Sequence, residues 1–269
     1  MSKKEKKKRT AGDIIRNLIL VIAIGVFAFS AFQLGKIFLE YKAGTDEYNR
    51  VREYVTVTEP EPEQEQEQEE TQTEPEAEEA KPVPPQVDFD SLKAINPDVI
   101  GWIQIEGTSI SYPIMKGTDN EYYLKHTFEG NYNAAGSIFI DYNNNSNFED
   151  CNTIIYGHNM KNGSMFGLLR KHFKDQASVP GRYIWICTPD KNYRYEIFSS
   201  HVVDAAGEVY TLFSAPDEQF ASYLEKMKSQ SLVDFQTEVT AEDKVITLST
   251  CTGNDATRFV VQAKREGTY

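Results

Sequence analysis

The carboxyl-terminal two thirds of this sequence predict a mostly β domain, folded as a closed or nearly closed barrel. Short runs of β-branched and aromatic residues recur from about residue 100 to the end. Gly, Pro, Asn or Asp separates most of these runs, and few segments have helical spacing. Runs of this kind between turn-forming residues are typical of strands. Many short strands with few helices favour a barrel.

The expected elements follow from this pattern in chain order. Residues 90–95 predict a brief helix, 121–126 a short helix or turn, and 166–173 a further helix. Residues 216–227 predict an amphipathic helix, because four apolar side chains share one face and Pro216 lies in the first turn. The expected strands are residues 100–105, 110–114, 136–141, 153–156, 182–187, 193–203, 245–251 and 258–263.

The amino-terminal 39 residues predict a membrane anchor. Six basic residues lie between Lys3 and Arg9, and no charged residue lies between Asn17 and Gly35. About 20 apolar residues span a bilayer as a helix. We therefore expect a cytoplasmic tail over 1–16, a transmembrane helix over 17–39, and all that follows outside the cell. The alternative is a cleaved signal peptide, with small residues at Ala28 and Ser30 for the cleavage site.

Residues 40–86 predict a stalk and a disordered linker. Eleven glutamates lie between Glu59 and Glu79, and they account for most of the net charge of −13. Such a segment repels itself and buries no apolar surface, so it serves as a spacer. A calcium-binding tract is the alternative, but nothing there imposes a ligand geometry. Tyr48 and Val51 have helical spacing, so residues 43–58 continue the membrane helix or form a stalk helix. A composition change near Val87 sets the predicted domain at 87–269.

Three cysteines do not indicate a disulfide framework, so each is considered as a thiol. Cys187 lies within an apolar run and is expected in the core. Cys151 lies in a polar loop before a strand, with no histidine or basic residue beside it in the sequence. Cys251 ends an apolar strand, and Arg258 follows seven positions later. A nearby cation favours the reactive thiolate, and a guanidinium can hold a developing oxyanion.

One of the four histidines differs from the others in its setting. His126, His172 and His201 lie in a turn, at a helix end and in a strand, where structural or surface roles are expected. His158 ends the apolar strand 153–156, follows a glycine and opens a polar loop. Because arginine cannot lose its proton, His158 is the candidate to move protons near Cys251.

These motifs resemble those of the sortases, the membrane-anchored cysteine transpeptidases of Gram-positive bacteria. The resemblance is carried by T-L-S-T-C at 247–251, Y-G-H at 156–158 and R-F-V-V at 258–261, and covers roughly residues 88–269. N-P-D-V-I-G-W-I at 96–103, G-S-I-F-I-D at 136–141 and the helix at 216–227 resemble class B. The Cys251–Arg258 loop is short for that class and begins with Thr252 rather than an acid.

The resemblance implies a closed eight-stranded barrel with a helix before the last two strands. It implies that Cys251 attacks a C-terminal sorting signal after threonine and forms a thioacyl enzyme, while His158 transfers protons and Arg258 holds the carbonyl oxygen. Asn120, Leu124, Ser249 and Thr252 match substrate-binding positions, and the Thr252 N–H would support the oxyanion. The implied partners are surface proteins that carry a C-terminal sorting signal, a peptidoglycan amine and the membrane; class B members prefer Asn-Pro-type signals, but the sequence leaves the signal of this chain open. No metal, cofactor or nucleic acid is expected.

Three other functions remain to be weighed. An L,D-transpeptidase-like enzyme has Ser-x-Gly-Cys-x-Arg, with a glycine and a spacing that Cys251 and Arg258 lack. A pilin-polymerising sortase would use a protein lysine as acceptor, and the sequence leaves this open. A membrane-tethered binding module with an incidental cysteine is the non-enzymatic alternative.

Overall fold

The structure is a computed structural model that describes residues 11–57 and 82–269. The chain divides into two compact units, residues 1–43 and Gly44–Tyr269. In the first, residues 11–43 belong to helix α1 (Ala11–Val51), whose apolar side chains from Leu18 to Leu39 are exposed. Within the described residues, this is the one helix long and apolar enough to cross a membrane. The predicted glutamate-rich linker falls largely on residues 58–81, outside the described residues.

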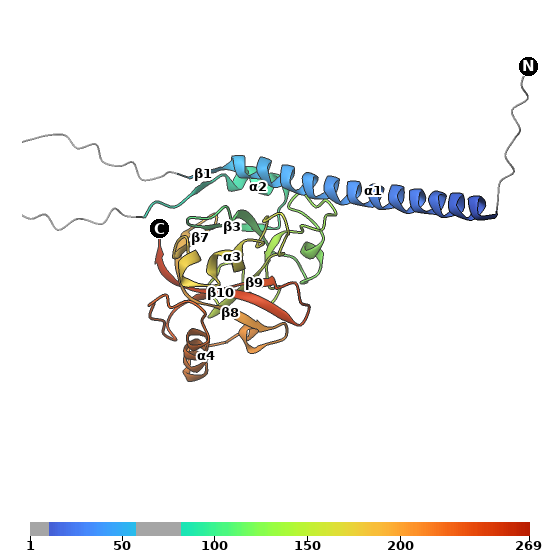
Figure 1. The fold of residues 1–269 in the computed structure, drawn as a ribbon. Helices are drawn as coiled ribbons and strands as arrows, with labels where there is room; N and C mark the ends of the chain where they lie inside the picture. The colour runs from blue at the N-terminus through green and yellow to red at the C-terminus, as the bar shows by residue number, and fades with distance from the viewer. Residues whose placement is uncertain (1–10, 58–81) are drawn as a thin grey trace, which may run out of the picture. The chain divides into compact units, whose positions relative to one another are not determined.

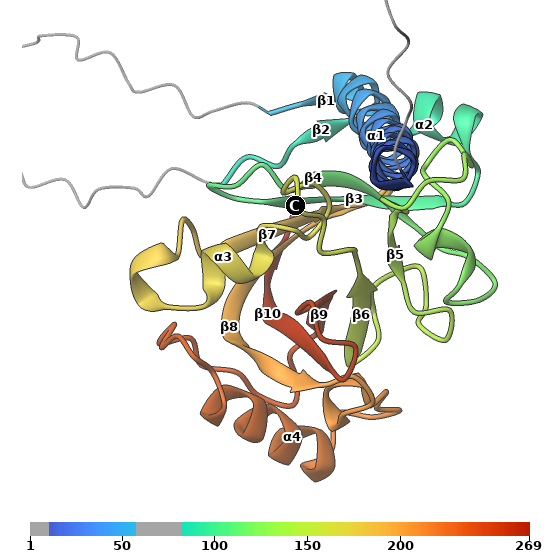
Figure 2. The same cartoon turned by 45° about the vertical axis from the view of Figure 1, so that its right-hand side comes forward.

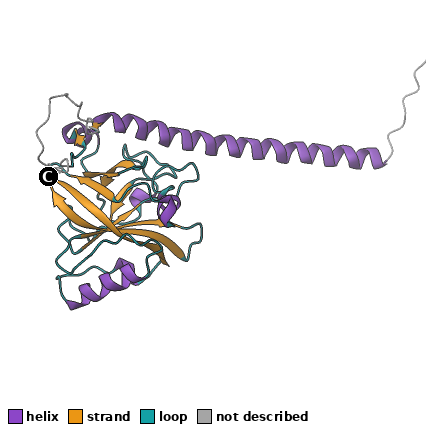
Figure 3. Ribbon diagram, turned by 60° about the vertical axis from the view of Figure 1, so that its left-hand side comes forward, coloured by secondary structure: helices purple, strands orange, loops and turns teal. Residues whose placement is uncertain are grey.

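The second unit is a closed barrel of eight strands, as predicted (Figures 1 and 3). The strand order is β10-β8-β7-β3-β4-β5-β6-β9, and only the pairs β4–β5 and β6–β9 are parallel. The strands are β3 (Val99–Ile105), β4 (Ser111–Met115), β5 (Ile138–Ile140), β6 (Asn152–Tyr156), β7 (Tyr183–Cys187), β8 (Asn192–Asp204), β9 (Val245–Cys251) and β10 (Thr257–Thr268).

Few helices accompany the barrel. They are α2 (Phe89–Ile95), α3 (Leu169–Phe173), α4 (Glu218–Ser229) and four single turns, η1 (Arg52–Tyr54), η2 (Tyr122–Leu124), η3 (Gln176–Ser178) and η4 (Glu208–Tyr210). Asp217 caps α4 by accepting from the N–H groups of Gln219 and Phe220. The four predicted apolar residues of α4 are buried, and α4 lies outside the barrel against β8 (Figure 2). The predicted helix before the last two strands is thus confirmed.

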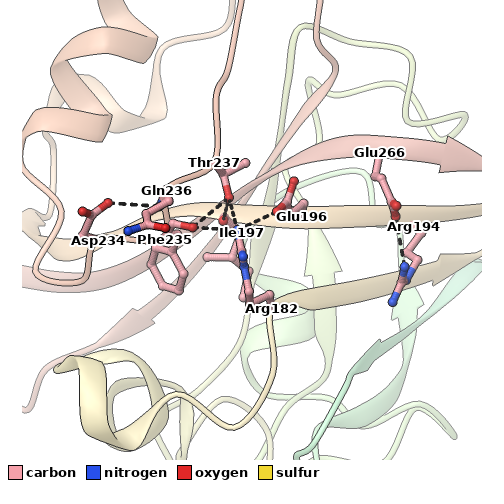
Figure 4. Close-up of polar contacts among 9 residues, drawn as sticks. All are labelled: Arg182, Arg194, Glu196, Ile197, Asp234, Phe235, Gln236, Thr237 and Glu266. Atoms are coloured by element: carbon pink, nitrogen blue, oxygen red, sulfur yellow. Dashed lines mark hydrogen bonds and ion pairs between the residues drawn. The ribbon is translucent and has the colours of Figure 1, made fainter. Parts of the chain in front are cut away.

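The segment between α4 and β9 is held to the barrel by Arg182 (Figure 4). Its Nη2 donates to Glu196 Oε1 at 2.7 Å, to the Phe235 carbonyl at 2.6 Å and to Thr237 Oγ1 at 2.9 Å. Thr237 Oγ1 in turn donates to the Ile197 carbonyl at 2.9 Å. These contacts fix the path by which the chain leaves α4 and enters β9, the strand that ends at Cys251.

Several elements differ in length from the sequence prediction: β5 is shorter than the predicted 136–141, and two further differences have an identifiable cause. β10 continues to Thr268, because the 13-residue strand β8 pairs with it as far as Tyr193. The helix predicted over 166–173 begins only at Leu169, because Met165 has a left-handed φ of 55° and the next residues form a turn. Neither difference could be read from local spacing, since both depend on a partner segment.

The compact unit begins well before the predicted boundary at Val87. Tyr48 and Val51 are buried, and β1 (Val55–Thr56) pairs with β2 (Gln86–Val87). Residues 44–57, assigned to the stalk from the sequence, therefore belong to the compact unit that contains the barrel. The burial of Tyr48 and Val51 could not be predicted from the sequence, because the surface that buries them is formed by loops distant in the chain.

Candidate active site

Cys251 and Arg258 are brought face to face by strand pairing. They are register partners in the antiparallel pair β9–β10, and the intervening turn passes through Gly253 at φ 90°. A positive φ costs little at glycine, which has no Cβ. The chain therefore reverses within the short loop, and the thiol and the guanidinium end up at one rim of the barrel.

His158 reaches the same rim from β6. β6 runs parallel to β9, with Tyr156 opposite Ser249, and the Gly157 N–H donates to the Ser249 carbonyl at 3.1 Å. His158 follows directly, where the strand has ended. The next residue, Asn159, donates from Nδ2 to the Cys251 carbonyl at 2.8 Å. The loops that carry His158 and Cys251 are thus joined directly.

The orientation of the His158 imidazole is defined by a backbone carbonyl. Nε2 lies 2.7 Å from the carbonyl oxygen of Leu124. A carbonyl oxygen only accepts, so Nε2 carries the proton and Nδ1 is the nitrogen left for chemistry in the neutral ring. In many catalytic histidines a carboxylate has this orienting function. Here its place is taken by a main-chain group of the loop that precedes β5.

Arg258 is also held by main-chain groups. Its Nη1 donates to the carbonyl oxygens of Asp255 and Thr257, both at 2.9 Å. Nε and Nη2 have no partner among the residues that the structure describes, and Arg258 lines the same groove as Cys251. The fork is anchored on one nitrogen and keeps three N–H donors for a ligand.

A groove of about 340 Å³ collects most of the predicted site residues. Its lining includes His158, Cys251 and Arg258, together with three of the four predicted substrate-binding residues, Asn120, Leu124 and Ser249. Phe139, Tyr156, Gly157, Ala205, Tyr210 and Thr250 complete it. Residues from five separate parts of the chain therefore meet at one concave surface.

Thr252 is the predicted site residue that the groove does not include among the described residues. Its Oγ1 lies 2.6 Å from Oγ1 of Thr257 and so closes the turn between β9 and β10. The side chain stabilises that turn, and only its backbone N–H follows Cys251 directly. A contact of the Thr252 side chain with substrate has no support in this arrangement.

Two tyrosines that were not predicted as site residues line the groove, and one of them, Tyr156, belongs to the Y-G-H motif. Tyr210 bonds Ser249 Oγ at 2.8 Å, and burial raises its pKa. Tyr156 donates to Asp141 Oδ2 at 3.0 Å, and burial raises its pKa as well. Asn120 donates to the same carboxylate oxygen at 2.7 Å. Tyr210 lies in η4, far along the chain from any motif, so no local pattern indicated it.

The remaining cysteines and histidines lie outside the groove. Cys187 is fully buried, as predicted, and burial raises its pKa to about 12. Burial also raises the pKa of Cys151, which packs beneath α4. Burial lowers the pKa of His201 to about 4. Of the three thiols, Cys251 alone is more than slightly exposed.

Comparisons with known proteins agree with this geometry. The protein-family model of the sortase domain matches residues 103–266. Sortase B of Listeria monocytogenes is 40% identical over 178 residues, covering 64% of this chain and 72% of that protein. The structure of Clostridium perfringens sortase B has a TM-score of 0.62 and 37% identity, covering 67% of this chain and all of that one.

A solved Staphylococcus aureus sortase B–substrate complex has a TM-score of 0.61 and 32% identity, covering 66% of this chain and 83% of that one. The family match covers more than half of the chain, and these relatives share the barrel as well as the sequence. The chain therefore belongs to the sortase family of cysteine transpeptidases and is most like the class B sortases.

Proposed function

We propose that this sortase is anchored in the cell membrane by residues 17–39 and acts outside the cell on C-terminal sorting signals. It joins the surface protein that carries such a signal to an amine of a peptidoglycan precursor. The observation that carries the proposal is the meeting of Cys251, His158 and Arg258 at one groove. Helix α1 supports the anchor, because it is long and apolar enough to cross a membrane.

The first half-reaction uses Cys251 as the nucleophile. The Cys251 thiol gives its proton to Nδ1 of His158, and the sulfur attacks the carbonyl carbon of the threonine in the signal, so that the carbonyl oxygen gains negative charge. Arg258 supports that oxygen with its free N–H donors, aided by the backbone N–H of Thr252. The C–N bond then breaks, the leaving amine takes a proton from His158, and a thioester remains on Cys251.

The second half-reaction runs through the same groups. The amine of the acceptor attacks the thioester carbon and gives its proton to His158. The C–S bond breaks, Cys251 leaves as a thiolate, and a new amide joins the surface protein to the acceptor. Asn120, Leu124 and Ser249 line the groove on the way to Cys251, and we propose that they contact the signal.

A product assay tests this function. The full-length protein in detergent is incubated with a panel of sorting-signal peptides, including Asn-Pro types, and with amine acceptors, and the products are identified by mass spectrometry. We expect a Cys251 thioester and an amide to the peptidoglycan amine. Exclusive transfer to a protein lysine would replace the proposed acceptor, and the absence of any covalent adduct on Cys251 would refute the mechanism.

A further inference from the structure

The Leu124 carbonyl that orients His158 belongs to a loop with little regular structure. This segment, called here the Leu124 loop, comprises residues 120–137 and contains only the turn η2. A loop carbonyl can hold an imidazole in one orientation only if the loop itself is held. Residues 44–52 make the contacts that hold this loop. They comprise the end of α1 and the first residue of η1, and are called here the brace.

Glu47 fixes one turn of the Leu124 loop. Its side chain is only 4% exposed, and its carboxylate accepts three hydrogen bonds from residues 127–131. Oε1 accepts from the Glu129 N–H at 2.9 Å, and Oε2 accepts from Thr127 Oγ1 at 2.8 Å and Asn131 Nδ2 at 3.2 Å. A buried carboxylate is stable only when such donors surround it. The turn and the brace therefore stabilise each other.

Tyr48 reaches the part of the loop that lies against Leu124. Its hydroxyl donates to the Gly136 carbonyl at 2.6 Å and accepts from the Phe128 N–H at 3.2 Å. Gly136 has a φ of 55°, and a Cβ there would lie 2.8 Å from the Leu124 carbonyl oxygen. The Gly136 backbone thus rests directly on the group that binds His158. Burial raises the pKa of Tyr48, so its hydroxyl stays protonated and can donate.

The brace also supports the other side of His158. The Tyr48 ring packs edge-on against the ring of Tyr112, with 5.3 Å between centroids. Tyr112 accepts from the Met165 N–H at 2.9 Å. Met165 pairs with Asn159 across an isolated bridge, and the Phe166 N–H donates to the His158 carbonyl at 3.0 Å. Two chains of contacts therefore run from Tyr48 to His158, one through each flanking loop.

We infer that the brace is a positioning element for the His158 imidazole, with Glu47 and Tyr48 as its positioning residues. The inference rests on the proposed acid–base role of His158. Neither side chain touches the groove. They act by keeping the Leu124 carbonyl at hydrogen-bond distance from Nε2, which leaves Nδ1 as the nitrogen that can accept a proton. The helix that carries the proposed membrane anchor thereby also contributes to the active site, through its last two turns.

The test compares Tyr48→Phe with wild type in the full-length protein. Phenylalanine keeps the ring contact with Tyr112 and removes only the hydroxyl. The matched control is Tyr193→Phe, another nearly buried tyrosine, which bonds Glu149 at the opposite end of β8 from Arg258. We expect kcat to fall roughly tenfold to a hundredfold in Tyr48→Phe, with a smaller change in KM, because small misplacements of catalytic groups are costly.

A second readout follows the imidazole itself. In wild type, nitrogen NMR of labelled histidine should show His158 with its proton on Nε2, and the His158→Gln variant assigns that signal among the four histidines. Tyr48→Phe should show a mixture of tautomers, and Tyr193→Phe the wild-type signal. Glu47→Gln should have the same effect as Tyr48→Phe, because the N–H₂ group of the new glutamine would face N–H and O–H donors of the Leu124 loop and could not accept their hydrogen bonds. Rates are compared below the unfolding temperature of every variant.

Three outcomes overturn the inference. The first is a folded Tyr48→Phe protein with the wild-type kcat and the wild-type His158 tautomer. The second is a Tyr48→Phe protein that keeps full kcat although its His158 tautomer is altered. The third is a loss of kcat in Tyr193→Phe equal to that in Tyr48→Phe. Failure of the proposed function looks different, because His158→Gln would then remain fully active. The tautomer signal decides in that case whether the brace holds the ring.

Discussion

Replacing Gly157 by alanine should damage catalysis while leaving every polar group of the site in place. Gly157 separates the end of β6 from His158. A Cβ at this position would lie 2.6 Å from Cδ2 of Phe166 and would also overlap Cδ1 of Ile138. Both neighbours are fully buried, so neither can swing into solvent. One added methyl group must therefore move the backbone at Gly157, the Phe166 ring or both.

The magnitude follows from these distances. Carbon atoms in contact prefer about 3.5–4.0 Å, so the strand end or the ring has to shift by about 1 Å. Overpacking of this kind costs roughly 1–3 kcal/mol of stability. The Phe166 N–H is bonded to the His158 carbonyl, so the shift passes to the imidazole. A displacement of about 1 Å can cost on the order of a hundredfold in rate.

The assay measures kcat for cleavage of a sorting-signal peptide together with the free energy of unfolding in urea. Gly267→Ala is the control, because the atoms nearest to its Cβ would belong to the ring of Tyr269, which is 42% exposed and can yield toward solvent more easily than a buried ring. We expect the control to keep its activity. A Gly157→Ala protein with wild-type kcat would show that the packing around this residue does not position His158.

Three further predictions concern the nucleophile, the brace and an interior histidine. Cys251→Ala should abolish the thioester seen by mass spectrometry. Arg258→Lys should lose most of kcat, because the ammonium group of lysine is a point charge and lacks the planar guanidinium of arginine. Full activity in either variant would remove that residue from the mechanism. A protein that starts at residue 87 should be roughly 3–5 kcal/mol less stable than one that starts at residue 44, because it lacks the buried side chains of Tyr48 and Val51. Equal urea unfolding midpoints for the two proteins would contradict this. Burial holds the pKa of His201 at about 4, below its usual 6.5. Between these two pH values the unfolded chain binds a proton at this histidine and the folded chain does not. The free energy of unfolding therefore falls as the pH drops from 6.5 toward 4. The loss between pH 7 and pH 5 should be about 2 kcal/mol, and His201→Phe should lose less over the same range if this group is responsible.

Local patterns were sufficient wherever a residue's role depends on its neighbours in the chain. Short runs of β-branched and aromatic residues between turn-forming residues located all eight strands, and the ends of those strands marked Cys251 and His158 as side chains held at a rim. The turn between β9 and β10 is local too, so the pairing of Cys251 with Arg258 could be anticipated. The four apolar residues on one face of α4 likewise predicted the surface that the helix buries.

Only the tertiary structure showed which distant groups complete the site. Tyr210 reaches Ser249, and the Leu124 carbonyl reaches His158, across 39 and 34 residues of chain. Glu47 and Tyr48 lie 80 residues before their partners Thr127 and Phe128 in the loop that they hold. Main-chain acceptors and single buried hydroxyls have no residue-type signature, because every residue has a carbonyl and any tyrosine can supply a hydroxyl. Short strand-forming runs between turn residues thus predicted the barrel and its rim, whereas long-range contacts of the chain decided how the imidazole is oriented and where the compact unit begins.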